Sequence, residues 1–205
     1  MRETGLRELK KRRTFDAVSA IAIGMFLEQG FDRVSVSDIA AAAEISKPTL
    51  FRYFPSKEDL VLHRIADHAG EPARVVAARA PGQSPVDALH RRFLDGLSSR
   101  DPVTGLNDVP EVLAFHDLVF STPSLATRVH DYQVRDEESL AAALPAADPL
   151  TARLAAAQIL AVQRVLAREN WRRLSAGESA DALYPAAVRA ADAAFGQLRG
   201  GIDQV

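Results

Sequence analysis

Cysteine is absent from this sequence of 205 residues, which excludes disulfide bonds, thiolate metal ligands and cysteine nucleophiles together. Long apolar runs are absent too. The longest, residues 17–27, contains a serine and a glycine and is far short of the roughly 20 residues that a membrane span needs. The N-terminus is charged at once and has no apolar stretch after it, unlike a secretory signal. We expect a cytoplasmic protein with no membrane partner.

Sequence motifs of enzymes are missing as well. The sequence has no glycine-rich phosphate loop, no Gly-x-Ser-x-Gly elbow and no His-Glu-x-x-His spacing. A di-iron helical bundle needs two Glu-x-x-His motifs, whereas this chain offers only the pair Asp87 and His90 at that spacing. We therefore expect no enzyme activity, no catalytic residues, no metal site and no cofactor.

Acidic and basic residues nearly balance, with 25 Lys and Arg against 27 Asp and Glu, so a uniformly basic coat for nucleic acid is excluded. The two signs are unevenly distributed, however. Residues 1–57 hold ten basic and seven acidic side chains, a net charge of +3, and residues 58–205 have a net charge of −5. A basic head on an acidic body indicates that an anionic polymer meets one end of the molecule.

Signals for β-strands are nearly absent, and glycine and proline divide the chain into pieces of helical length. The first helix is expected from near Lys10 to Gly30, where glycine suits a C-terminal cap. Ser35 and Asp38 have capping-box spacing and open a second helix to about residue 43. A third helix begins at Ser46 and ends by residue 54.

Ser56 and Asp59 form a second capping box, which opens a longer helix that Gly70 and Pro72 end or kink. Five more helices are expected, at about 86–99, 108–121, 124–144, 149–174 and 179–199. The fold class is all-α, with an N-terminal three-helix head and a larger C-terminal helical bundle, about nine helices in total.

The two short helices of the head, joined by a tight connector, are typical of a helix-turn-helix module. In such a module the second short helix enters the DNA major groove, and Ile39, Leu50 and Phe54 are the natural core that joins the two helices. Lys47 can donate to guanine, and Thr49 offers a hydroxyl and a methyl group to a base. The predicted DNA contacts are Ser35, Ser37, Ser46, Lys47, Pro48, Thr49, Phe51, Arg52, Tyr53 and Lys57. The alternative for each is a solvated or packed side chain.

The stretch 17–65 resembles the TetR family of bacterial transcriptional regulators. The resemblance is carried by Gly-Phe-Asp at 30–32, Ser-Val-Ser-Asp-Ile-Ala at 35–40 and Ser-Lys-Pro-Thr-Leu-Phe-Arg-Tyr-Phe-Pro-Ser-Lys-Glu-Asp-Leu at 46–60. It implies a homodimer that binds a palindromic operator in double-stranded DNA, acts as a repressor and is released by a small-molecule effector. Glu44 departs from the pattern, because the family usually has glycine in the turn; a left-handed conformation there would cost about 1–2 kcal/mol.

The helical body, residues 58–205, is expected to bind the effector and to dimerise, while residues 1–57 form the DNA-binding domain. Polar groups on otherwise apolar helices need partners, which a ligand can supply in a cavity. The predicted pocket residues are Phe93, Phe115, His116, Phe120, Tyr132, Gln158 and Gln163. The alternative is that the aromatic residues among them are ordinary core. The apolar, aromatic body favours a lipophilic effector.

The last two helices carry apolar stripes in which alanines allow close helix approach, and the resemblance implies a four-helix interface between two subunits. The predicted interface residues are Leu154, Ala161, Val165, Leu183, Ala187, Ala191, Ala194 and Leu198. The alternative is that these stripes are buried within one subunit.

Two other functions remain open from the sequence. One is an architectural DNA-binding dimer without an effector, and the other is a small-molecule-binding bundle without specific DNA binding. Sequence-selective, ligand-sensitive DNA binding would exclude both.

Overall fold

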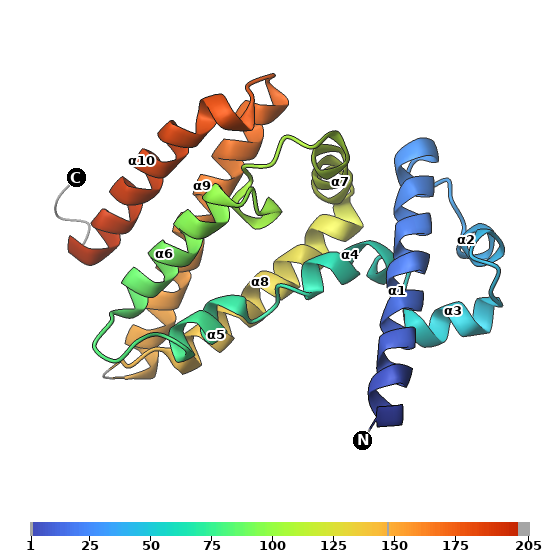
Figure 1. Ribbon diagram of the computed structural model, residues 1–205, viewed down its shortest axis with the longest axis horizontal. Helices are drawn as coiled ribbons and strands as arrows, with labels where there is room; N and C mark the ends of the chain where they lie inside the picture. The colour runs from blue at the N-terminus through green and yellow to red at the C-terminus, as the bar shows by residue number, and fades with distance from the viewer. Residues whose placement is uncertain (1, 147, 201–205) are drawn as a thin grey trace. The chain divides into compact units, whose positions relative to one another are not determined.

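A computed structural model describes residues 2–146 and 148–200 of the chain, with side chains from residue 13 onward. The residues described form ten α-helices and one short 3-10 helix, and they contain no β-strand (Figure 1). The predicted all-α class is confirmed. The elements are α1 (Arg2–Gln29), α2 (Val36–Ala42), α3 (Lys47–Tyr53), α4 (Asp59–Ala66), α5 (Glu71–Ala77), α6 (Pro85–Ser98), η1 (Pro102–Thr104), α7 (Pro110–Ser121), α8 (Pro123–Ala143), α9 (Pro149–Ser175) and α10 (Ala180–Gly200).

The helices α6 to α10 begin and end within two residues of their predicted bounds. The predicted start of the first helix was wrong, because α1 begins at Arg2 rather than near Lys10. Its predicted end is confirmed. Gly30 has a φ of 90°, and its N–H donates to the carbonyl of Phe26 at 2.8 Å, as in a helix C-terminal cap. The sequence reading missed α5, a short helix that follows the left-handed Gly70.

The chain folds as two compact units. The first contains the residues up to His68 together with Ala114–Asp131, and the second contains Ala69–Leu113 and the residues from Tyr132 onward. α4 therefore belongs to the same unit as the three head helices, and α7 and α8 each contribute residues to both units.

In the first unit, the three residues expected to join α2 to α3 are fully buried: Ile39 and Leu50 are 0% exposed and Phe54 is 1% exposed. This prediction is confirmed. α1 packs against both α2 and α4. A buried hydrogen bond from Ser19 Oγ to the carbonyl of Leu60, 2.7 Å long, links α1 to α4. The short helices α2 and α3 are thus fixed by packing, since helices of seven residues are not stable alone.

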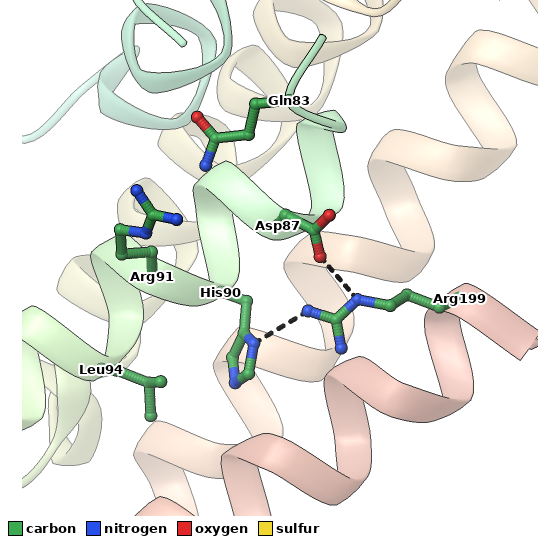
Figure 2. Close-up of a pocket in the computed structure, with 6 residues that line it drawn as sticks. All are labelled: Gln83, Asp87, His90, Arg91, Leu94 and Arg199. Atoms are coloured by element: carbon green, nitrogen blue, oxygen red, sulfur yellow. Dashed lines mark hydrogen bonds and ion pairs between the residues drawn. The ribbon is translucent and has the colours of Figure 1, made fainter. Parts of the chain in front are cut away.

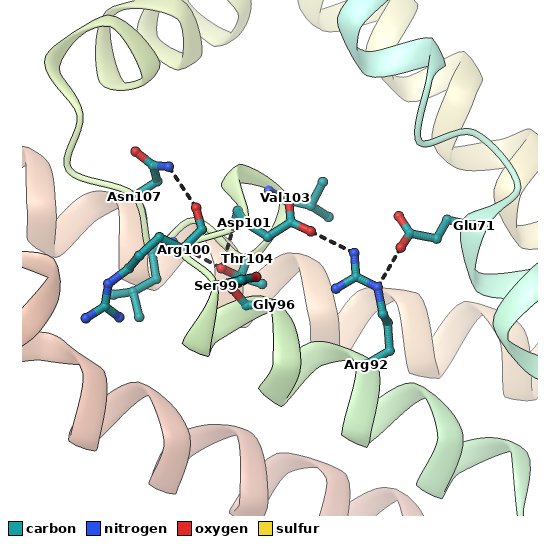
Figure 3. A network of polar contacts seen from close by, with 10 residues as sticks. Glu71, Arg92, Gly96, Ser99, Arg100, Asp101, Val103, Thr104 and Asn107 are labelled. Atoms are coloured by element: carbon teal, nitrogen blue, oxygen red, sulfur yellow. Dashed lines mark hydrogen bonds and ion pairs between the residues drawn. The ribbon is translucent and has the colours of Figure 1, made fainter.

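In the second unit, α6, α9 and α10 lie side by side and contribute most of the residues of an apolar core (Figure 1). Figure 3 shows how the chain at the end of α6 is held. Arg92 contacts Glu71 at 2.6 Å and Asp101 at 2.7 Å, which joins α5, α6 and the residue before η1. Asn170 of α9 is buried and donates to the carbonyl of Thr104 at 2.9 Å.

α8 holds the start of α5 in the same unit. The N–H of Gly70 donates to Asp136 Oδ1 at 2.7 Å. Burial raises the pKa of the Asp136 carboxyl above its ordinary value, against the lowering effect of the Gly70 N–H and of Arg74. The folded protein therefore holds a proton at Asp136 more tightly than the unfolded chain does, so this group lowers the stability as the pH rises through its titration range.

We predict that Asp136→Asn raises the melting temperature at neutral pH, because the amide oxygen still accepts the Gly70 N–H and no charge is buried. The advantage over the wild type should shrink as the pH falls and vanish near the ordinary carboxyl pKa of about 3.9. Thermal unfolding of both proteins across this range measures the difference. A difference that stays constant with pH would contradict the assignment.

Candidate DNA-binding site

The helix-turn-helix begins with a capped α2. The side chain of Ser35 accepts the N–H of Asp38 at 3.1 Å, and Asp38 accepts the N–H of Ser35 at 2.9 Å, which completes the predicted capping box. Hydrogen bonding to Ser35, through its side chain and then its backbone, lowers the pKa of the Asp38 carboxyl. Ser35 and Ser37 are both exposed at the start of this helix, as the predicted phosphate contacts require.

The turn between α2 and α3 passes through Glu44 in a left-handed conformation, with a φ of 54°. The N–H of Glu44 donates to Ala41 and the next N–H, of Ile45, donates to Ala40 at 3.0 Å. These bonds have the pattern of a helix C-terminal turn that glycine normally closes. Glu44 stands where the TetR family usually has glycine. It therefore takes the strained left-handed conformation that this departure from the family pattern suggested.

α3 is fixed at its N-terminus by Ser46. The side chain of Ser46 accepts the N–H of Thr49 at 3.2 Å, and the two hydroxyl groups lie 2.8 Å apart. Pro48 stands in the first turn, where a missing N–H costs nothing. The Thr49 hydroxyl is therefore engaged in the cap, and its half-buried side chain offers less to a base than the sequence suggested.

The side chains of α3 divide into a buried anchor and an exposed face. Leu50 is the buried residue of the helix, whereas Lys47, Pro48, Phe51 and Arg52 are exposed. Phe51 is 41% exposed. The exposed face thus contains two cationic side chains and one aromatic ring. Cationic groups can donate hydrogen bonds to base edges, and an apolar ring can contact a thymine methyl group.

The end of α3 is packed rather than free. Tyr53 lies edge-on to Phe15 of α1, with ring centroids 5.0 Å apart, and Arg52 lies 5.3 Å from the Tyr53 ring centroid. Phe15 also packs against Phe54 and against His63 of α4. Tyr53 is half-buried by this cluster.

Lys57 points inward in this structure. Its ammonium group donates to the carbonyl of Phe31 and lies 4.4 Å from the centroid of the Phe31 ring and 5.5 Å from that of Phe26. The sequence predicted that this ammonium group contacts a DNA phosphate. In the structure it contacts the turn after α1, because a carbonyl and two aromatic rings there attract the cation.

The residues predicted for the effector pocket belong to both compact units, and among them His116 and Phe120 are in ring contact, with centroids 4.3 Å apart. Phe93 is buried in the core of the second unit near Phe195, which is the alternative that the sequence left open. Gln158 is exposed on α9, and Phe120 is 39% exposed. Phe115, His116 and Phe120 belong to the first compact unit, while Phe93, Tyr132, Gln158 and Gln163 belong to the second.

An open surface groove of about 300 Å³ lies between α6 and α10, and none of the predicted pocket residues lines it. Figure 2 shows its polar contacts: Arg199 Nε is 2.7 Å from Asp87, and its Nη2 is 2.9 Å from His90 Nδ1. His90 also lies 3.0 Å from Asp192 and stacks on Phe195. The lining residues are Gln83, Asp87, His90, Arg91, Leu94 and Arg199.

The predicted dimer surface is corrected on α10. Leu183, Ala187 and Ala191 are at most 3% exposed because they pack into the core with α6 and α9, so they have no surface left for a partner. Ala194 and Leu198 are half-buried on the same helix.

α9 retains an exposed apolar face. Leu150, Leu154 and Val165 are 58%, 54% and 66% exposed, and Ala161 between them is half-buried. In the part of the chain that the structure describes, α9 is also the one helix long and apolar enough to cross a membrane, a test that helices of bundles pass as well. Because apolar surface in water is unfavourable, this face is a candidate contact surface.

The fold and the site define a helix-turn-helix DNA-binding protein with a helical body. Residues 18–63 match the family model described as bacterial regulatory proteins, tetR family. The HTH-type transcriptional regulator TcmR of Streptomyces glaucescens is 33% identical over 179 residues, which cover 82% of this chain and 78% of that protein. The chain belongs to the TetR family, and it is a DNA-binding transcriptional regulator rather than an enzyme.

Two further similarities extend this result. The HTH-type transcriptional repressor LfrR of Mycolicibacterium smegmatis is 30% identical over 124 residues, 57% of this chain and 62% of that protein. The crystal structure of native NalD, the secondary repressor of the MexAB-OprM multidrug efflux pump in Pseudomonas aeruginosa, has a TM-score of 0.62 and 16% identity, and the match covers 90% of this chain and 96% of that chain. The similarity to NalD is a similarity of fold.

We predict that Glu44→Gly raises the free energy of unfolding by up to about 1 kcal/mol, because glycine removes the left-handed strain but adds freedom to the unfolded chain. Glu44→Val should lower it by about 1 kcal/mol or more, because a β-branched residue is least tolerated there. Urea unfolding of the three proteins ranks them. A Gly variant less stable than the wild type would show that Glu44 is not strained.

Proposed function

We propose that this regulator is a cytoplasmic, homodimeric repressor that binds a palindromic operator and is released by a small-molecule effector. The main support for the proposal is the exposed face of α3, the helix that Ser46 caps. The exposed residues of this helix are Lys47, Pro48, Phe51 and Arg52. Each subunit would place this face in the major groove, with half-sites about 34 Å apart or a multiple of that spacing.

The residues of the face have separate roles in this proposal. Lys47 donates to guanine O6 and N7, and the exposed Phe51 ring contacts a thymine methyl group. Arg52 and Tyr53 hold phosphates beside the groove, together with Ser35 and Ser37 at the start of α2. Since Lys57 is engaged with Phe31, it supports the head from inside rather than holding a phosphate.

The dimer is supported by the exposed apolar face of α9. Leu150, Leu154, Ala161 and Val165 follow one another at helical spacing, and the exposed Gln158 lies on the same face. A second copy of this helix would cover the face. The outward side of α10, with Ala190 and Ala193, would complete a four-helix interface in place of the buried stripe that the sequence suggested.

The effector proposal rests on the family resemblance. The relative LfrR, which is named a repressor, supports the repressor part of the proposal. A lipophilic compound that binds the helical body would release the operator if it favours a state in which the two α3 helices cannot dock together. Such a compound must both raise the melting temperature and weaken DNA binding, which a screen with both readouts can detect.

The DNA proposal predicts selective binding. Fluorescence anisotropy on DNA from upstream of the protein's own gene, or on DNA selected from a random library, should show tight binding that survives moderate salt. Shuffled DNA of equal length is the control. Lys47→Ala should relax the preference for one base position by about 1–3 kcal/mol.

Equal, steeply salt-dependent binding to selected and shuffled DNA would contradict specific recognition and favour the architectural alternative. A loss that is uniform over all sequences in Lys47→Ala would assign Lys47 to a phosphate instead of a base.

The dimer proposal predicts that Leu154→Glu yields a monomer of 22.2 kDa, while the wild type has twice that mass. The introduced charge would be buried in the interface without a partner, which is costly. Val109→Glu, at a valine that is 47% exposed outside α9, is the matched control and should remain a dimer. Light scattering at micromolar concentration measures both. A monomeric wild type would end the proposal.

A further inference from the structure

The Asp59 carboxylate is one of the groups that hold the segment between α3 and α4. Asp59, the first residue of α4, accepts the N–H of Ser56 at 2.9 Å and its hydroxyl at 2.8 Å, both on Oδ2. Ser56 follows the buried Phe54 by two residues, so its position sets where the chain can go after α3. The N–H of Asp59 in turn donates to Ser56 Oγ at 3.3 Å, so these reciprocal bonds hold the turn that leads from α3 into α4.

The second oxygen of this carboxylate is bound from α8. Arg128 Nη2 donates to Asp59 Oδ1 at 2.5 Å, and the Asp59 side chain is only 19% exposed. Arg128 and Asp59 lie 69 positions apart in the sequence but in the same compact unit. A charge-assisted hydrogen bond to a partly buried carboxylate orients both partners more strongly than an exposed ion pair does.

We infer that Arg128 is a positioning residue for DNA binding: acting through Asp59 and Ser56, it holds α3 in the orientation that presents Lys47 and Arg52. The inference rests on the proposed function of α3. Arg128 itself contacts no DNA in this account. α8 itself continues beyond Asp131 into the second compact unit.

The test compares Arg128→Gln with Arg135→Gln in the full-length protein. Arg135 lies on the same helix, is exposed and stacks only loosely on Tyr132, 5.8 Å from its ring centroid, so the control removes the same charge. Arg128→Gln should raise the Kd for the selected DNA about three- to tenfold. The slope of log K against log salt should stay that of the wild type, since no phosphate contact is lost. Arg128→Lys should recover part of the affinity.

Hydrogen exchange of the free protein gives a readout that needs no DNA. The amides of residues 47–60 should exchange faster in Arg128→Gln than in Arg135→Gln, while the melting temperatures of the two variants stay close.

Equal Kd and equal exchange in the two variants would overturn the inference. A salt slope reduced by about one would also overturn it, by making Arg128 a phosphate contact. If the wild-type protein binds no DNA selectively, the proposed function fails, and the exchange measurement alone then decides whether Arg128 positions α3.

Discussion

The position of α3 depends on the burial of one leucine, and so does the set of side chains that this helix exposes to solvent. α3 has seven residues and one fully buried side chain, Leu50, so neither its stability nor its orientation can come from the helix itself. Ile39 and Phe54 are buried on either side of it in the sequence, and α1 and α4 close the core around them. With Leu50 buried, Phe51 and Arg52 lie about 100° and 200° around the helix from it and are exposed, while Lys47 is exposed in the first turn.

Polar contacts at the two ends of α3 complete this arrangement. At the N-terminal end, Ser46 caps the helix and Glu44 accepts a left-handed conformation in the turn. At the C-terminal end, Ser56 and Asp59 direct the chain into α4, and Arg128 attaches this end to α8. The strain at Glu44 is tolerated because the packing on both sides determines the path of the turn.

Local patterns in the sequence predicted the parts of the structure that depend on neighbours in the chain. The capping boxes at Ser35 and Ser56, the cap at Gly30 and the buried Leu50 were all visible as spacings of residue types. Features that depend on distant residues were not visible. The contact of Arg128 with Asp59 joins residues far apart in the chain, and periodicity alone does not indicate whether the apolar stripe of α10 faces its own core or a partner.

The central claim is that two α3 helices occupy successive major grooves of one operator. Methylation interference on the selected DNA tests it directly, because methylation at guanine N7 blocks the major groove and methylation at adenine N3 blocks the minor groove. We expect guanine methylation to interfere at two symmetric positions separated by about 10 base pairs or a multiple of it. Interference at adenines alone, or at a single position, would contradict the account.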